Sequence, residues 1–234
     1  MKEASITNRL LAALPHAEHK RLLGGLELVT LKFGETLHES GVPFPYAYFP
    51  IDCAVSLLAT GKGHPDLQIG MVGHEGVIGI PMALGIHVSS LRASVQQSGS
   101  AMRMQSAMFR KNCLQSEPLR QALHRYKHAL TGQIAQSAVC NQFHSIHERL
   151  ARYLLMTGDC ARSMEFRLTQ EFIALMLGVR RVGVTHAASD LRKRKMIECS
   201  RGRIAILDRK RLSAASCECY KIIKRINDRV YSDD

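Results

Sequence analysis

Short alternating apolar segments fill the first half of the chain. Between residues 26 and 105, β-prone runs are separated by turn residues such as Gly34 and Gly41. The runs cover residues 26–32, 46–49, 54–58, 67–72, 94–97 and 101–104, and a short helix is predicted before them at 6–14. Short strands at this spacing predict a compact antiparallel barrel or roll.

A helical pattern begins at Ser116, with Pro118 in the first turn, where proline is tolerated. Its apolar stripe consists of Leu119, Leu123, Tyr126, Leu130 and Ile134. We expect this stripe to form the seam of a homodimer, although packing against the chain's own barrel gives the same spacing. A second helix is predicted from Val139 to Met156, with its stop at Gly158.

The segment after Leu168 has the spacing of a helix-turn-helix. Thr169 is suited to cap the first helix, and Ala174 is small where two helices press together. Gly178 permits the positive φ of a tight turn, and Val184 points back into the junction. A second helix starting near residue 179 or 180 places four side chains where such a helix enters the major groove. These are Arg180, Arg181, Thr185 and His186.

Two β-prone runs, 196–200 and 203–207, flank Arg201-Gly202 and predict a hairpin that forms a wing. The chain is therefore expected to be α+β, with three parts. These are a β-roll sensor domain at 1–115, a dimerisation helix at 116–138 and a winged helix-turn-helix DNA-binding domain at 139–234.

Charge agrees with this division. The net charge is +12 and the isoelectric point is near 9.6, which indicates a polyanionic partner such as double-stranded DNA. Residues 178–213 hold 11 Lys and Arg against three acidic residues. No apolar run approaches the roughly 20 residues that span a bilayer, and the first residues lack the pattern of a secretory signal. Seven scattered cysteines favour reduced thiols, so a cytoplasmic protein is expected.

The chain resembles the Crp/Fnr superfamily of transcriptional regulators over nearly its full length. In the roll, the resemblance rests on Phe33-Gly-Glu-Thr-Leu37, Gly41, Tyr48-Phe-Pro50 and Val72-Gly-His-Glu-Gly76. Its most specific stretch runs from Leu168 through Gly178 to Arg181. The resemblance implies a cyclic-nucleotide-binding-like β-roll and a homodimer whose recognition helices read an inverted repeat. It also implies contact with RNA polymerase.

By this resemblance, Arg181 falls where the family commonly has an arginine that reads guanine. Val182 replaces a glutamate of many relatives, and His186 stands where the catabolite activator has arginine, so a different operator is implied. Contacts to phosphate are expected from Arg180, Lys193, Lys195, Arg201 and Arg203. Thr169, Gln170 and Thr185 complete the expected DNA-binding set.

The expected β-roll sensor domain lacks the residues that would identify its ligand. Gly76-Val-Ile-Gly79 and Leu91-Arg-Ala-Ser-Val95 depart from the family's cyclic-nucleotide motifs, so cyclic AMP is not expected. Arg92 is left as a candidate for an anion, against an ordinary solvated arginine.

Cofactor motifs are incomplete as well. The first cysteine is Cys53, which excludes an N-terminal iron–sulfur motif, and neither His74 nor His87 has the spacing of a haem ligand. His124-x-x-x-His128 and Cys217-x-Cys219 each offer two metal ligands without an identified third. No cofactor, metal or catalytic motif is therefore expected. A redox- or metal-responsive sensor of the same fold remains the alternative function.

Overall fold

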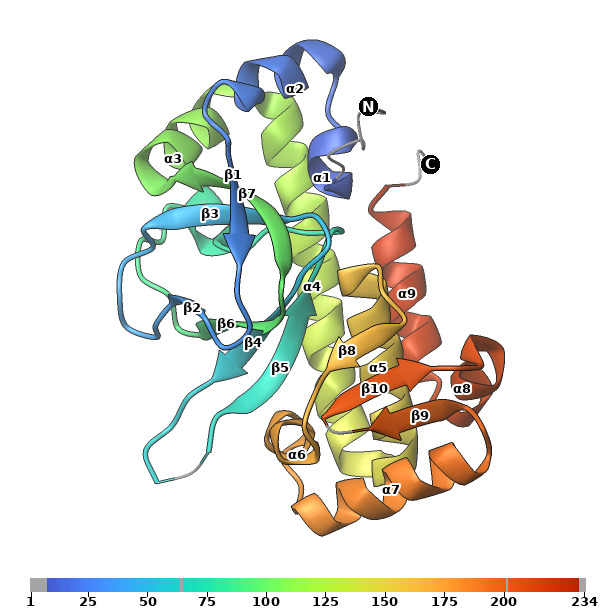
Figure 1. Ribbon diagram of the computed structural model, residues 1–234. Helices are drawn as coiled ribbons and strands as arrows, with labels where there is room; N and C mark the ends of the chain where they lie inside the picture. The colour runs from blue at the N-terminus through green and yellow to red at the C-terminus, as the bar shows by residue number, and fades with distance from the viewer. Residues whose placement is uncertain (1–7, 64, 201, 232–234) are drawn as a thin grey trace.

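The computed structural model describes residues 8–63, 65–200 and 202–231. A β-roll and a smaller C-terminal unit lie on either side of a long central helix (Figure 1). The first half contains α1 (Arg9–Ala12), α2 (His16–Leu23), β1 (Glu27–Leu31), β2 (Thr36–His38), β3 (Tyr46–Pro50), β4 (Ala54–Ala59), β5 (Leu67–Val72), the 3-10 helix η1 (Ile80–Leu84), β6 (Arg92–Gln97), β7 (Gly99–Gln105) and α3 (Ser106–Gln115). The second half contains α4 (Glu117–Phe143), α5 (Ile146–Ala161), β8 (Glu165–Arg167), α6 (Gln170–Leu177), α7 (Arg181–Lys193), β9 (Ile197–Ser200), β10 (Arg203–Ile206), α8 (Arg209–Ala215) and α9 (Cys219–Arg229). No helix among the described residues is long and apolar enough to cross a membrane.

The β-roll consists of two antiparallel sheets. One has the strand order β1-β7-β3 and the other β2-β6-β4-β5. All six predicted strands are present, with ends shifted by at most two residues, and the turns at Gly34 and Gly41 have the positive φ of 80° that glycine favours. The short strand β2 and the helices α2, η1 and α3 were not predicted. Of the helix predicted at 6–14, only Arg9–Ala12 is helical among the described residues, and residues 6 and 7 lie outside them.

The long helix α4 extends further than the sequence predicts. It starts after Ser116, whose side chain accepts a hydrogen bond from the backbone N–H of Leu119 at 3.2 Å. The prediction of a new helix at Val139 is wrong, because α4 continues to Phe143. The next start signal is Ser145, which forms a capping box with Glu148 and opens α5.

The predicted stop at Gly158 is also wrong. This glycine lies within α5, and a Cβ atom there would come within 3.0 Å of the Ser163 carbonyl oxygen. Gly158 therefore allows close packing against Ser163 and does not end the helix. The left-handed conformation that ends α5 is adopted by Arg162, with φ 50°.

The apolar stripe of α4 packs against the chain's own roll. Leu119, Leu123, Tyr126 and Leu130 are all buried in one hydrophobic core with residues of the β-strands, and Ile134 packs against that core. This is the second of the two possibilities that the sequence left open, in which the stripe packs against the chain's own barrel. Because four of its five side chains are covered within one chain, we do not assign the dimer seam to this stripe.

Two buried polar contacts join the roll to the helices behind it. The side-chain amide of Gln133 on α4 pairs with Met71, accepting from its N–H at 2.6 Å and donating to its carbonyl at 3.1 Å. This satisfies backbone groups on the free edge of β5, which would otherwise be left unpaired. On β6 of the same sheet, Gln96 accepts from Ser56 at 2.7 Å and donates to Thr157 on α5 at 2.7 Å.

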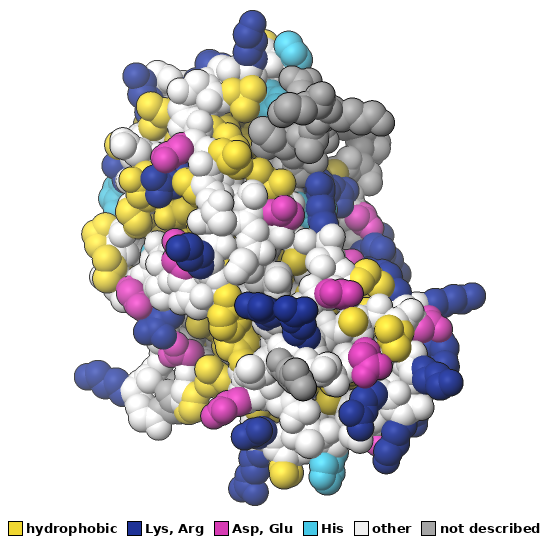
Figure 2. All heavy atoms as spheres, in the orientation of Figure 1, with side chains coloured by type: hydrophobic (Ala, Val, Ile, Leu, Met, Phe, Trp, Pro, Cys, Tyr) yellow, Lys and Arg dark blue, Asp and Glu magenta, His cyan; other side chains and the backbone are white. Residues whose placement is uncertain are grey.

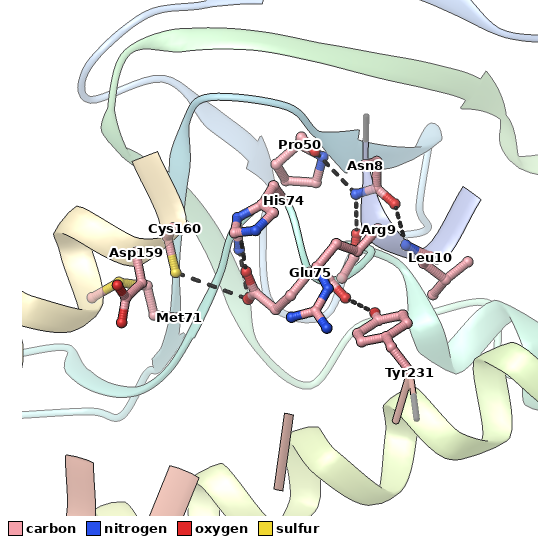
Figure 3. A network of polar contacts seen from close by, with 12 residues as sticks. Asn8, Arg9, Leu10, Pro50, Met71, His74, Glu75, Asp159, Cys160 and Tyr231 are labelled. Carbon is pink, nitrogen blue, oxygen red and sulfur yellow. Dashed lines mark hydrogen bonds and ion pairs between the residues drawn. The ribbon is translucent and has the colours of Figure 1, made fainter. Parts of the chain in front are cut away.

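A third junction surrounds Glu75, in the turn after β5 (Figure 3). Its carboxylate accepts from the N–H of Gly73 at 2.9 Å, and the thiol of Cys160 on α5 lies 3.9 Å from it. Asn8 donates to the Gly76 carbonyl at 2.8 Å, and Tyr231 donates to the carbonyl of Glu75. The turn thus contacts the N-cap residue of α1, helix α5 and Tyr231, which follows α9.

We expect Glu75→Gln to alter the pH dependence of stability. Burial raises the pKa of Glu75 above its ordinary value of about 4.5. Between the ordinary and the raised pKa, the folded chain keeps a proton that the unfolded chain releases, so the free energy of unfolding falls as the pH rises. The amide of the variant has no such proton. Urea denaturation from pH 4.5 to 8 should show the variant gaining stability over the native chain as the pH increases, and a constant difference would contradict this.

Candidate nucleic-acid interface

The helix-turn-helix is formed by α6 and α7. The Thr169 side chain accepts from the N–H of Phe172 at 3.1 Å, which caps α6 as predicted. Gly178 ends α6 with φ 63°, and the N–H of Val179 then donates to the Ala174 carbonyl at 3.0 Å. Ala174 and Val184 are both buried between the helices. Each steric role assigned from the sequence is therefore present.

The second helix presents one continuous exposed face at its N-terminal half. It begins at Arg181, one or two residues later than predicted, and Arg180 occupies its N-cap. Arg181, Val182, Thr185 and His186 are all exposed. Val182 is 65% exposed, an apolar side chain left uncovered within this polar face. Figure 2 shows Lys and Arg side chains along the lower edge of the molecule, the end that α7 occupies in Figure 1.

A hydrogen bond fixes the two helices relative to each other at this surface. The hydroxyl of Thr185 on α7 donates to the side-chain oxygen of Gln170, the first residue of α6, at 2.7 Å. On the opposite side, Asp190 of α7 lies 2.9 Å from the Nε2 atom of His147 on α5. The exposed face of α7 is thus held by contacts to two other helices before any ligand binds.

The predicted wing is present and has a third strand. β9 and β10 form the hairpin, and β8, which was not predicted, pairs with β10 on its other side. In this register Arg203 lies directly opposite Arg167. Like charges in that arrangement repel, so a negatively charged partner would relieve the repulsion. Arg201, another expected phosphate contact, lies outside the described residues.

A groove of about 330 Å³ runs between the start of the helix-turn-helix and the wing. It brings together four of the predicted residues, which are Thr169, Gln170, Arg181 and Arg203. Arg192, near the end of α7, lines it as well. From the sequence, Arg192 is expected only as part of the local positive charge. Arg167 is not expected at this surface, because the strand β8 that carries it is only three residues long. Lys193, the last residue of α7, and Lys195, two residues after it, are exposed and do not line this groove.

Arg92, the candidate for an anion in the roll, has carboxylate partners. Its guanidinium forms ion pairs of 2.6 Å with both Glu39 and Asp66. An anionic ligand would have to displace these two carboxylates. The contacts favour the interpretation of Arg92 as a surface arginine.

Comparison with known proteins identifies the same region. Residues 148–215 match the Crp-like helix-turn-helix domain. No curated protein sequence matches the chain.

Solved structures match over most of the chain. FixK2 from Bradyrhizobium japonicum is 16% identical, with a TM-score of 0.68 and coverage of 82% of this chain and 98% of FixK2. A protein from Eubacterium rectale assigned to the Crp/Fnr regulators is also 16% identical, with a TM-score of 0.66 and coverage of 88% and 97%. A CRP-family transcriptional regulator from Thermus thermophilus is 18% identical, with a TM-score of 0.63 and coverage of 82% and 99%.

These similarities cover 82–88% of the chain. The roll, the long helix and the helix-turn-helix follow one another in the order expected from the sequence. Residues 148–215 form a Crp-like helix-turn-helix domain, and the chain as a whole has the fold of the Crp/Fnr transcriptional regulators.

Proposed function

We propose that this protein is a sequence-specific regulator of transcription that binds double-stranded DNA as a homodimer. The observation that carries the proposal is the exposed N-terminal face of α7, flanked by the arginines of the wing. A helix in this position enters the major groove, and basic side chains beside it meet the phosphates. As a regulator of this type it acts in the cytoplasm and contacts RNA polymerase.

Base reading is assigned to the first two turns of α7. Arg181 offers a bidentate pair of donors to guanine, and Val182 offers a methyl surface to thymine. Val182 has no hydrogen-bonding atom in its side chain, so it selects by apolar contact alone. The hydroxyl of Thr185 donates a hydrogen bond to the side chain of Gln170. This contact positions Thr185 and Gln170 beside the base-reading residues, where they would meet the edge of the DNA major groove.

Phosphate binding is assigned to the wing and the turn. Arg167 and Arg203 face each other across β8 and β10 and would share one stretch of DNA backbone. Arg180 at the start of α7 and Lys193 at its end complete a basic border around the base-reading residues. These contacts provide affinity and salt dependence without sequence preference.

The dimer seam is placed on the face of α4 opposite the buried stripe. Positions on this face recur every three or four residues, the spacing of a coiled-coil seam, and all of them are exposed. They are Gln121, His124, His128, Thr131, Ala135, Ala138 and Gln142. Small residues at Ala135 and Ala138 allow two helices to approach closely. The proposal thus keeps α4 as the dimer helix and changes the side chains that form the seam.

Ala138→Glu is expected to convert the dimer to monomer. A carboxylate at this position would meet its own copy across the seam, where like charges repel and desolvation is costly. Sedimentation velocity would measure the mass, and circular dichroism would confirm the fold. Ala17→Glu, which makes the same substitution at an exposed position of α2, is the matched control. A dimer that persists in Ala138→Glu would place the seam elsewhere.

Selection of bound duplexes from a random DNA pool tests the function itself. A dimer with two-fold symmetry should recover an inverted repeat. Recovery of unrelated sequences with equal efficiency would indicate a protein that coats DNA without preference, and the proposal would then be wrong.

A further inference from the structure

Three cysteines and a histidine meet at the base of the long helix. Cys140 and His144 are one helical turn apart at the end of α4, and Cys217 and Cys219 lie where the chain passes from α8 into α9. The three sulfurs and one imidazole nitrogen all lie within 4.8 Å of one another. In the sequence, Cys217-x-Cys219 offers two potential metal ligands, and no third ligand can be identified nearby. The other two come from a helix more than 70 residues earlier, so only folding brings them together.

The separations are close to the edges of a tetrahedral site. Zinc binds sulfur at about 2.3 Å and imidazole nitrogen at about 2.0–2.1 Å, so two sulfurs stand about 3.8 Å apart and a sulfur and a nitrogen about 3.6 Å apart. Two of the observed separations are 3.5 Å, between the sulfurs of Cys140 and Cys217 and between the sulfur of Cys219 and Nδ1 of His144. The others are at most 4.8 Å, so movements of the side chains would bring all four atoms to one ion.

Two neighbouring side chains orient the ligands. The Nε2 atom of His144 lies 3.2 Å from a carboxylate oxygen of Glu218, so a proton on Nε2 leaves Nδ1 free to bind a metal. Imidazole ligands of metals commonly donate their other N–H to a carboxylate in this way. Gln136, one turn before Cys140 on α4, donates to the sulfur of Cys219 at 3.1 Å. The cluster thus has supporting contacts on two of its four ligands.

Charge and burial fit the same interpretation. The three cysteines are at most 3% exposed and form a small core of their own, apart from the two large ones. Arg152 is buried beside Cys140 and Cys217, and its Nε atom has no hydrogen-bond partner among the described residues. A divalent ion bound by three thiolates carries a net charge of −1. Such a centre would compensate the buried guanidinium, which is otherwise costly.

We propose that Cys140, Cys217, Cys219 and Nδ1 of His144 bind one Zn²⁺ ion in a closed, tetrahedral site. Four protein ligands leave no position for substrate, so the ion is structural. It ties the end of α4, where the DNA-binding unit begins, to the start of α9, which packs along α4 (Figure 1). The site goes beyond the proposed function and stands whether or not the chain binds DNA.

The test measures metal in the full-length chain. The chain is purified under reducing conditions with Zn²⁺, dialysed, and analysed for zinc by plasma mass spectrometry and for free thiols by a chromogenic reagent. We expect one zinc per chain. Replacement of zinc by Co²⁺ should give the absorption bands of a tetrahedral ion with thiolate ligands. A chelator should lower the melting temperature, because metal binding contributes to folding stability.

Variants separate the ligands from the other cysteines. Cys217→Ser should lose stoichiometric zinc, and Glu218→Gln should weaken zinc affinity about 10- to 100-fold, as loss of a supporting contact typically does. Cys199→Ser, on strand β9 of the wing, is the matched control and should retain one zinc and the response to chelator. Substoichiometric zinc in a native chain with all seven thiols reduced would overturn the proposal, as would full zinc binding by Cys217→Ser. A disulfide between Cys140 and Cys217 in the reduced preparation would also overturn it.

Discussion

Replacement of Leu123 by alanine is expected to lower the free energy of unfolding by about 2 to 5 kcal/mol. Leu123 is completely buried in the core between α4 and the roll, so alanine would remove packing atoms and leave a cavity. Urea denaturation at several protein concentrations would measure the loss. The range of concentrations matters because the stability of a dimer depends on protein concentration.

The control is Lys111 on α3, which is exposed and lies outside the proposed seam. A substitution by alanine there should change the free energy of unfolding by about 0.5 kcal/mol or less. The two interpretations of α4 predict opposite results. If Leu123→Ala instead dissociated the dimer and left the stability of the monomer unchanged, the buried stripe would be the seam after all.

Arg181→Ala is expected to weaken binding to the selected operator by about 10- to 100-fold, corresponding to about 1 to 3 kcal/mol. Affinity for random DNA of the same length should change much less. Arg181 is exposed at the first position of α7, where a side chain reaches base edges. Fluorescence anisotropy with the operator and a scrambled duplex, at one fixed salt concentration, would measure both affinities.

Arg203→Ala provides the contrast to Arg181→Ala. As a phosphate contact, Arg203 should contribute equally to the operator and to random DNA, and its loss should reduce the slope of log affinity against log salt by about 1. An equal loss of affinity for both duplexes in Arg181→Ala would show that Arg181 binds phosphate and does not read a base.

The sequence predicted well wherever a local constraint decides the structure. The positive φ at Gly178, the cap at Thr169 and the buried Val184 each follow from the steric needs of two adjacent helices. The strands of the roll were found because alternation and turn residues act within a few positions. Helix ends were predicted less well. The capping box at Ser145 marks the start of α5, although the sequence predicted that start at Val139. Gly158 is not a stop signal because it lies within α5 in close contact with Ser163.

Features that depend on contacts between distant segments were missed or left open. Nothing in the spacing of Leu123 tells whether its partner is the roll or a second copy, because both require the same stripe. The pairing of Arg167 with Arg203 depends on the register of a three-residue strand. The ligands Cys140 and Cys217 lie 77 residues apart and become neighbours only when α9 packs on α4.

We propose that two copies of this chain bind one operator through their two α7 helices. The most direct test is the stoichiometry of binding to the selected operator and to a version with one half-site scrambled, measured by sedimentation with labelled DNA. We expect two chains per operator, half-sites centred roughly 34 Å apart, and a large loss of affinity when one half-site is scrambled. Binding of a single chain, with affinity unchanged by the scrambled half-site, would contradict it.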